Sequence, residues 1–380
     1  MRVESGEANL HIVGDPRGRE KLSTPALLVD LDPFETNLAL MAQLCREAGI
    51  GLRPHVKGHK CLEIARRQVA SGAIGLACTT LAEAELMAPV APSILITSPV
   101  LGEERIARLA ALAAAVPLIV VVDSAAPGVV AAAAAASGRS IRVLVDIDVG
   151  QRRTGAPAAD AGAVLAAARA VSATPGLSFA GLQAYCGHLQ GVVDFVERSA
   201  RAREAQTAVS RLAALLRSEG LPPEIVSGGG TGTAIVDSSG APFTELQPGS
   251  YPFLDLQYGR EVLVPDQRPW FRQSLRVRSR VVSANQADRV TIDAGMKAIA
   301  TDGGPPAIAP GAGVSGDYVF AGDEHGFLML AAGSPRPKPG AAVELIPAHC
   351  DTTTNLHVAI HAVRGPALEA VWPVGARGRW

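Results

Sequence analysis

The sequence predicts an α/β protein with two parts, a (β/α)8 barrel of the TIM type and a β-rich domain that follows it. Short apolar segments alternate with longer helix-like segments from residue 26 to about 230, and eight such apolar segments occur before the alternation stops near residue 262. Strands that alternate with helices are typical of a parallel sheet, and eight repeats favour a closed barrel. We therefore expect the barrel over 26–261 and the second domain over 262–380, with residues 1–25 joining the second domain.

The predicted barrel elements follow one another in a regular order. The strand-like segments are 26–31, 51–56, 73–79, 93–99, 118–124, 141–147, 179–186 and 224–230. The helix-like segments between them include 33–48, 61–71, 102–115, 160–172 and 191–219. The alanine-rich segment 129–137 is expected to be one more surface helix, because alanine has the highest helix propensity.

The predicted second domain lacks helices of comparable length. Its strand-like segments lie within 276–295, 316–330 and 340–349, and they are separated by stretches rich in glycine and proline, such as 331–340. This composition is typical of short strands joined by turns. We therefore expect an all-β domain here.

Composition and charge limit the classes of partner. The 35 basic and 36 acidic residues are interspersed, which argues against a nucleic-acid or membrane-binding surface and favours a small-molecule partner. The five cysteines are scattered without any CxxC pair, so that neither a disulfide framework nor a structural zinc site is expected. No apolar run reaches the ~20 residues of a membrane span and no secretory signal is recognisable, so we expect a cytoplasmic protein.

A lysine follows the second predicted strand, in the segment RPHVKGHK (53–60). Residues at the carboxyl ends of barrel strands usually perform the chemistry. An ordinary basic loop is the alternative interpretation. In the functional interpretation, Lys57 is desolvated and crowded by cations, and its lowered pKa makes the amine a nucleophile that forms a Schiff base with an aldehyde.

A glycine-rich segment, SGGGTGT (227–233), follows the last predicted strand. It lacks the lysine of a P-loop and the spacing of a dinucleotide motif, and glycine clusters are often simple turns. At this place in a barrel, however, backbone N–H groups commonly bind phosphate, and residues 227–231 could do so. A reactive lysine and a phosphate site together fit a phosphorylated aldehyde cofactor.

Other polar residues are expected at the same rim of the barrel. Arg153 follows the sixth predicted strand, and Tyr185 and His188 follow the seventh. A salt-bridged arginine and a structural histidine are the alternatives. Near the end of the chain, His349 and Asp351 alternate along a segment predicted to be extended, so both would face one side and could bind a magnesium- or manganese-type ion. A surface histidine at a strand end is equally compatible.

The motifs taken together resemble one family of pyridoxal-phosphate (PLP) enzymes. RPHVKGHK, GLACTTLAEAE, DVGQRRTGA, SGGGTGT, ELQPGSYPFLDLQY, IDAGMKA, DEHGF and PAHCDTTTN occur in order along nearly the whole chain. They resemble the fold-type III enzymes that include D-threonine aldolase, 3-hydroxy-D-aspartate aldolase and the eukaryotic-type D-serine dehydratase. The resemblance implies an alanine-racemase-like barrel with a β domain, usually assembled as a homodimer.

The resemblance also implies roles for individual residues. Lys57, and not Lys60, matches the lysine that carries PLP, and Arg153 matches the residue that contacts its phenolic oxygen. The other implied cofactor-binding residues are Thr79, Tyr185, Ser227, Gly228, Gly229, Gly230, Thr231 and Tyr258. His349 and Asp351 match the metal ligands, and His188 is a candidate base, with a metal-bound hydroxide as the alternative.

One position distinguishes the branches of this family. The dehydratase branch has a cysteine two residues beyond the metal-binding histidine, whereas this chain has Asp351, whose carboxylate favours manganese or magnesium over zinc. We therefore expect an aldolase that cleaves D-β-hydroxy-α-amino acids to glycine and an aldehyde. The alternatives are a dehydratase that yields a 2-oxo acid and ammonia, a racemase, and a catalytically silent PLP-binding protein. Thr79 and Thr80 depart from the glutamine and lysine of the hydroxyaspartate aldolases, which weakens any transfer of their substrate preference.

Overall fold

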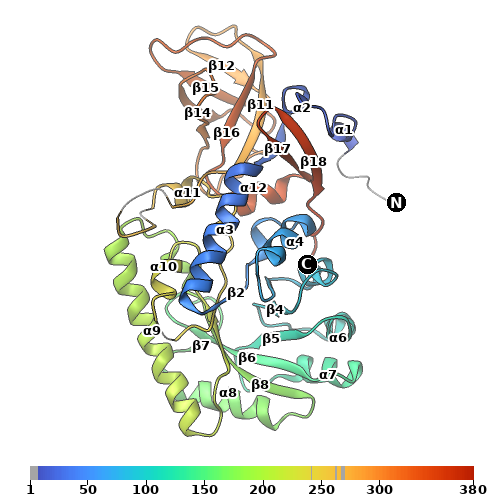
Figure 1. Ribbon diagram of the computed structural model, residues 1–380, viewed down its shortest axis with the longest axis vertical. Helices are drawn as coiled ribbons and strands as arrows, with labels where there is room; N and C mark the ends of the chain where they lie inside the picture. Colours follow the sequence, from blue (N-terminus) through green and yellow to red (C-terminus); the bar gives the residue numbers. More distant parts are fainter. Residues whose placement is uncertain (1–6, 241, 262, 267–269) are drawn as a thin grey trace.

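The computed structural model describes residues 7–240, 242–261, 263–266 and 270–380. A barrel surrounded by helices forms the lower part of the molecule in Figure 1, and a mostly β domain forms the upper part. Residues 1–6 of the expected N-terminal extension and residue 262, at the expected domain boundary, lie outside the described residues. No helix in the described part of the chain has the length and apolar character needed to cross a membrane.

The lower part contains a ring of eight parallel strands. In spatial order they are β2 (Gly51–Leu52), β10 (Glu245–Leu246), β9 (Ile225–Gly228), β8 (Leu177–Ala184), β6 (Ile141–Asp148), β5 (Leu118–Val122), β4 (Ile94–Ile96) and β3 (Leu76–Cys78), with the short β7 (Ala156–Pro157) beside β6. The two ends of this order are joined, because the Ala77 N–H donates to the Pro54 carbonyl at 2.9 Å and His55 forms a bridge with Ala77. The predicted barrel is therefore confirmed.

Helices cover the outside of the ring. They are α3 (Leu31–Ala48), α4 (Leu62–Ala70), α5 (Leu81–Met87), α6 (Ile106–Ala115), α7 (Gly128–Ser137), α8 (Ala161–Ala173) and α9 (Phe195–Ser218), with the short α10 (Ala234–Asp237) and α11 (Leu256–Gly259). Alternate strand residues point to opposite sides. Ile94 and Val120 therefore belong to the large core shared with the helices, whereas Leu95 and Val121 belong to a separate cluster inside the ring. The expected helices, including the alanine-rich one, are present.

The first predicted barrel strand lies elsewhere, and this expectation was wrong. Strand β1 (Ala26–Asp30) pairs with β11 and β17 of the second domain. The true eighth strand is β10, which has only two residues and therefore gives no periodic signal in the sequence. Consequently Lys57 follows the first strand of the ring, and the glycine-rich segment follows the seventh. Both still lie after carboxyl ends of parallel strands, as the prediction required.

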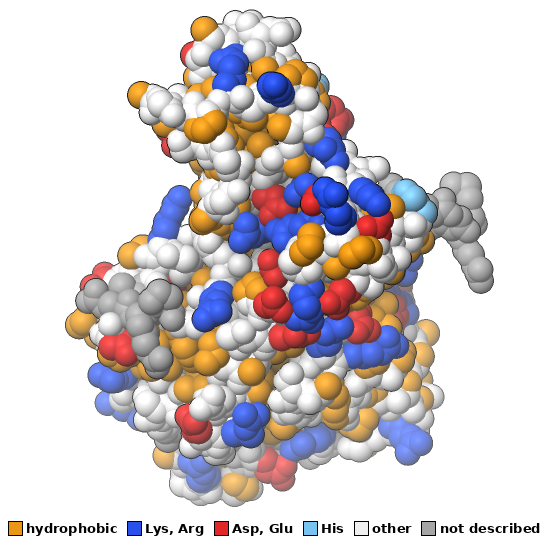
Figure 2. Space-filling model, turned by 45° about the horizontal axis from the view of Figure 1, so that its top comes forward, with side chains coloured by type: hydrophobic (Ala, Val, Ile, Leu, Met, Phe, Trp, Pro, Cys, Tyr) orange, Lys and Arg blue, Asp and Glu red, His pale blue; other side chains and the backbone are white. Residues whose placement is uncertain are grey.

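The second domain is mostly β, as the sequence predicted, and its strands form one sheet. Its order is β14 (Gly316–Phe320), β15 (Gly326–Leu330), β12 (Arg289–Ile292), β11 (Leu275–Ser283), β1, β17 (Ala359–Arg364) and β18 (Ala367–Pro373), with β16 (Ala342–Ile346) between β11 and β13 (Ala307–Ile308). The N-terminal helices α1 (Glu7–Leu10) and α2 (Gly18–Lys21) lie near β18 (Figure 1), where the Arg19 N–H donates to the Pro366 carbonyl. On the face shown in Figure 2, basic and acidic side chains are mixed, with a gathering of basic side chains at the base of the upper lobe.

Candidate active site

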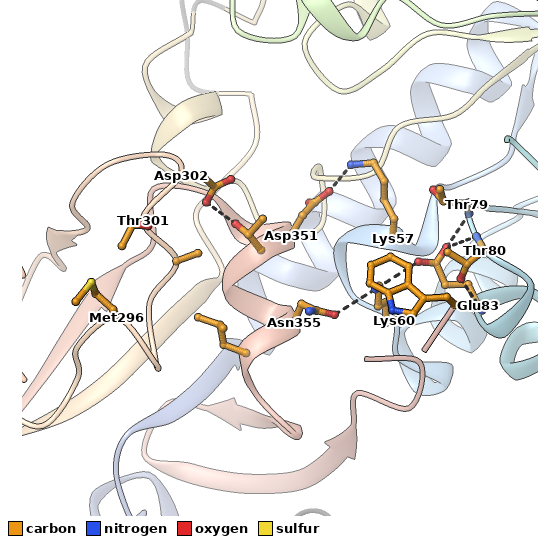
Figure 3. Close-up of a pocket in the computed structure, with 14 residues that line it drawn as sticks. Lys57, Lys60, Thr79, Thr80, Glu83, Met296, Thr301, Asp302, Asp351 and Asn355 are labelled. Atoms are coloured by element: carbon orange, nitrogen blue, oxygen red, sulfur yellow. Dashed lines mark hydrogen bonds and ion pairs between the residues drawn. The ribbon is translucent and has the colours of Figure 1, made fainter. Parts of the chain in front are cut away.

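A cavity of about 610 Å³ opens between the mouth of the barrel and the second domain. One wall comes from the loops after β2 and β3, and the other comes from the segment after β12 and from helix α12 (Cys350–Leu356). The lining residues are Lys57, Lys60, Thr79, Thr80, Glu83, Met296, Ala300, Thr301, Asp302, Asp351, Thr352, Asn355, Leu356 and Trp380. Figure 3 shows how Lys57 and Asp351 point toward each other from the two walls.

The loop after β2 places Lys57 in this cavity. Residues Val56–Gly58 form a 3₁₀ turn, and the ring nitrogen Nδ1 of His55 accepts a hydrogen bond from the Lys57 N–H at 3.3 Å. Burial lowers the pKa of His55 to about 3, so its ring is neutral and can accept this bond. The other ring nitrogen of His55 lies 3.1 Å from the Thr97 hydroxyl, inside the barrel. His55 therefore fixes the turn that carries the lysine.

The charge state of Lys57 differs from the expectation. Its ammonium forms an ion pair with Asp351, and this carboxylate raises the pKa of Lys57 above its ordinary value despite partial burial. The neighbouring cations do not crowd it, because Arg53 forms a bidentate pair with Glu245, at 2.8 and 2.9 Å. The prediction of a lowered lysine pKa was therefore wrong. Its partner comes from a segment almost three hundred residues away, so the local sequence could not reveal it.

Asp351 lies in the first turn of α12, and His349 immediately precedes this helix. The expected extended segment is therefore wrong, because the chain becomes helical at Cys350. Burial raises the pKa of Asp351, but the Lys57 charge and hydrogen bond more than offset this and leave the pKa well below its usual range. A Cβ atom on Gly58 would lie 2.9 Å from an Asp351 oxygen, so glycine permits this close approach of the two walls.

His349 has a partner that the sequence analysis missed. Its Nδ1 lies 2.6 Å from an Asp302 oxygen, and the Thr352 hydroxyl donates to the other Asp302 oxygen at 2.8 Å. Burial alone would raise the pKa of Asp302, but these hydrogen bonds leave it below its ordinary value. A carboxylate on one ring nitrogen is the usual arrangement for a histidine whose other nitrogen binds a metal. The nearby motif IDAGMKA was recognised, but it ends at residue 298, short of Asp302.

His349 and Asp351 stay the predicted metal ligands, and they are two in number. Among the described residues, no group of three or more His, Cys, Asp or Glu side chains converges in a way that could hold a metal ion. His349 and Asp351 would therefore leave several coordination positions for water and substrate. Such open coordination suits an oxygen-preferring divalent ion, and the residues present fit such a group.

The glycine-rich loop after β9 has the features of an anion cradle. Gly229 has a φ of +71°, which favours glycine, and a Cβ atom on Gly230 would lie 2.4 Å from the Gln190 side-chain oxygen. The Thr231 hydroxyl is buried without a hydrogen-bond partner among the described residues. An unpartnered buried hydroxyl in such a loop fits a phosphate group. The Ser227 hydroxyl instead donates to Glu245 at 2.5 Å, within the polar network of the barrel.

Two side chains that sequence reasoning missed hold this loop in place. The Gly232 N–H donates to the Gln190 side chain at 2.9 Å, and the Gln190 amide donates to the Thr233 hydroxyl at 3.1 Å. The guanidinium of Arg198, in α9, donates to the Gly232 carbonyl at 2.7 Å. Gln190 ends the motif YCGHLQ, which the sequence analysis noted only for Tyr185 and His188.

Three of the remaining predicted residues lie around the mouth of the barrel. The Arg153 guanidinium lies 5.9 Å from the centre of the Tyr185 ring. Burial raises the pKa of Tyr185, with Lys57 and Arg153 acting in the opposite direction, and burial also raises the pKa of Tyr258. Asp255 begins α11 and accepts hydrogen bonds from the N–H groups of Tyr258 and Cys350, at 3.1 and 2.7 Å. Asp255 therefore joins α11 to the start of α12.

Thr79 and His188 have different surroundings. Thr79 lines the cavity, and its N–H donates to Glu83 at 2.7 Å. The His188 ring instead lies about 3.3 Å from the position of a Cβ atom on Gly150, and its Nδ1 is buried without a partner among the described residues. The structure does not place His188 among the residues that line the cavity. Its role as a base stays a prediction.

Two protein families match the chain, one for each part. The family described as the alanine racemase N-terminal domain matches residues 29–256, and the family described as a putative serine dehydratase domain matches residues 274–363. The first match covers most of the barrel, and the second covers most of the sheet of the second domain.

Full-length relatives match as well. The chain is 40% identical to D-threonine aldolase of Arthrobacter sp., with 96% of this chain and 95% of that protein covered. It is 35% identical to 3-hydroxy-D-aspartate aldolase of Paracoccus denitrificans (strain Pd 1222), with 94% and 93% covered. The crystal structure of D-threonine aldolase from Filomicrobium marinum is similar with a TM-score of 0.89 at 38% identity, with 94% of this chain and 96% of that chain covered.

Proposed function

The chain belongs to the D-threonine aldolase and 3-hydroxy-D-aspartate aldolase family, in which an alanine racemase N-terminal domain is joined to a D-serine dehydratase-like domain, and we propose from this that it cleaves D-β-hydroxy-α-amino acids to glycine and an aldehyde. The observation that carries the proposal is the meeting of Lys57 and Asp351 across one cavity. These two residues come from the two parts of the chain. The pair therefore joins the expected cofactor-binding lysine to the expected metal ligand.

We propose PLP as the cofactor. Bound PLP supplies an electron sink for negative charge at the α-carbon of the substrate. The Lys57 amine would attach the cofactor, and Thr231 with the backbone of Gly229 and Gly230 would bind its phosphate. Gln190 and Arg198 would hold this loop in position through their bonds to Gly232. Arg153 and Tyr185 would bound the cofactor at the barrel mouth.

His349 and Asp351 would bind a divalent metal, for which we propose manganese or magnesium. Such an ion polarises the β-hydroxyl of the substrate as a Lewis acid and eases the loss of its proton. Asp351 is held in its ionised form, because its pKa lies well below neutral pH. Lys57 lies directly beside this carboxylate. We propose that its amine returns a proton to the α-carbon when glycine forms.

We propose that the preferred substrate has an uncharged β-substituent, as D-threonine does. Apart from Lys57, Lys60 is the only cation among the described lining residues, and it is engaged with Asn355 at 3.1 Å and with Glu83 at 3.7 Å. No arginine of the described part of the chain lines the cavity. Met296, Leu356 and Trp380 add exposed apolar side chains to the wall. A second carboxylate on the substrate would therefore lack a free cationic partner.

Product analysis with two substrates tests this function. The holoenzyme should convert D-threonine to glycine and acetaldehyde, with a kcat/KM at least about tenfold higher than for D-3-hydroxyaspartate, which corresponds to about 1.4 kcal/mol of differential binding. Glycine is measured by chromatography and the aldehyde by coupled reduction. Ammonia and a 2-oxo acid as the main products would contradict the aldolase and indicate a dehydratase. A preference for D-3-hydroxyaspartate would contradict only the proposed substrate class.

Asp302→Asn is expected to weaken metal binding without removing it. The amide cannot accept the His349 N–H as strongly as the carboxylate does, so the ring loses its orientation and some of its basicity. The Kd for manganese should rise about 10–100-fold, measured by electron paramagnetic resonance on the PLP-loaded protein. Asp323→Asn, an exposed residue paired with Lys297, is the matched control and should leave this Kd unchanged. An unchanged Kd in Asp302→Asn would show that Asp302 does not support a metal ligand.

A further inference from the structure

A second cavity, of about 310 Å³, lies in the second domain and shares no lining residue with the first. Its lining residues are Arg19, Arg276, Arg278, Ala309, Pro310, Gly311, Ala312, Ala342 and Glu344. Three arginines and one carboxylate are therefore its only charged groups among the described residues. No part of the proposed reaction uses them.

The three guanidinium groups converge because of the register of two strands. Arg276 and Arg278 are alternate residues of β11, so they lie on the same face, and Arg278 is directly opposite Glu344 of β16. Arg278 donates to Glu344 at 2.8 Å, and Arg19 of α2 makes two bonds to the same carboxylate, at 2.8 and 2.6 Å. Arg276 lies 3.6 Å from it. One carboxylate is therefore shared by three cations.

The positive charge of this cavity is only partly compensated. The side chains of Arg19, Arg276 and Arg278 are only 16%, 21% and 11% exposed, so water screens them poorly. Among the residues that the structure describes, the one other acid that contacts them is Asp30, which lies 3.6 Å from Arg19. Burial lowers the pKa of the Arg278 guanidinium, and the positive charges of Arg19 and Arg280 act in the same direction, against the effect of Glu344.

Donors in the cluster also remain unused. The Nε atoms of Arg276 and Arg278 are buried and have no hydrogen-bond partner among the described residues. A buried donor without an acceptor costs about 1–3 kcal/mol, and more when it is charged. Like charges that are buried close together destabilise the folded protein, and so do unsatisfied donors. Folding by itself therefore gives no reason for this arrangement. A negatively charged acceptor in the cavity would offset this excess of positive charge.

We propose that this cavity binds a small oxyanion of the phosphate class. Guanidinium groups match such an anion in shape, because their paired N–H groups donate to two oxygens at once. The cavity is also lined by the segment 309–312, Ala-Pro-Gly-Ala, which carries no charge that would repel an anion. The inference does not depend on the proposed aldolase function.

Calorimetric titration of the PLP-loaded protein with inorganic phosphate, in chloride buffer, tests the proposal. Wild type should bind one phosphate. Arg276→Gln should weaken this binding about 10–100-fold, the range expected for the loss of one charge-assisted donor. Arg289→Gln, which removes an arginine of β12 that does not line the cavity, is the matched control and should bind as wild type does.

Glu344→Gln is expected to change the phosphate affinity in the opposite direction. This variant removes the carboxylate that competes with the ligand for the same donors, so phosphate should bind more tightly than to wild type. Circular dichroism establishes that each variant is folded, and if Glu344→Gln does not fold, the comparison of Arg276→Gln with Arg289→Gln decides alone. The proposal fails if wild type binds no phosphate in the millimolar range. It also fails if Arg276→Gln binds phosphate as wild type does, because the anion would then lie elsewhere.

Discussion

Replacing Lys57 by alanine is expected to abolish both the covalently held cofactor and the aldol cleavage. The side chain of Lys57 reaches the cavity from the turn after β2, and no other lysine of the described chain except Lys60 lines that cavity. Turnover should fall by at least about 10⁴-fold, the scale seen when a group that acts covalently is removed. Wild type should show the visible absorbance of lysine-bound PLP, and Lys57→Ala should not.

Lys60→Ala is the matched control for the covalent link. Lys60 lies three residues further along the same loop, but its ammonium is engaged with Asn355 and Glu83. This variant should keep the absorbance, and mass spectrometry after borohydride reduction should locate the cofactor on Lys57 in both wild type and Lys60→Ala. A reduced adduct on Lys60, or a wild type that cannot be reconstituted with PLP, would contradict the assignment. Thermal unfolding followed by circular dichroism distinguishes loss of chemistry from loss of fold.

Replacing His349 by alanine is expected to have the second-largest effect. Among the described residues, only His349 and Asp351 would connect the metal to the chain. Loss of either should therefore raise the Kd for manganese by more than about 100-fold. This effect is larger than the one expected for Asp302, which would contact only the ligand His349. Activity should fall about 10³-fold, because Lewis-acid stabilisation contributes several kcal/mol. Metal content is measured by elemental analysis, and turnover by glycine release.

Chelation of the wild-type protein provides the complementary test. Removal of the metal should abolish activity, and manganese or magnesium should restore it better than zinc, because Asp351 supplies a hard oxygen ligand. His349→Ala should keep the PLP absorbance, since Lys57 is intact. Full activity of the metal-free wild type, or of His349→Ala, would rule out the proposed task of the metal. Better restoration by zinc would favour a dehydratase-like site.

Some elements of this fold depend on local sequence patterns, and others depend on contacts between distant segments. The helices α3, α4 and α6 to α9 and the strands β2 to β6, β8 and β9 were predicted, because their apolar pattern is a local property. The assignment of 26–31 to the barrel failed, because β1 is buried in the same way as a barrel strand and its pairing partners lie hundreds of residues away. The two-residue β10 gave no signal at all.

The candidate site also contains residues that local motifs reveal and residues that only the fold reveals. Strand-end position and family motifs singled out Lys57, Thr231 and Asp351 as predicted site residues. The partners Asp302, Gln190 and Arg198 were missed, because their roles arise only from the side chains that they meet in the fold. The pKa of Lys57 was predicted in the wrong direction for the same reason, since it depends on Asp351 across the cavity.

The sequence by itself determined the kinds of element, the order of the chemical groups and the family to which the chain belongs. The tertiary structure decided which sheet β1 joins, which carboxylate faces Lys57, and how three arginines come to share Glu344. The physical reason is distance. Periodicity and motifs record interactions between neighbours along the chain, whereas a pKa or a binding cavity depends on charges that are a few ångströms apart in space and far apart in sequence.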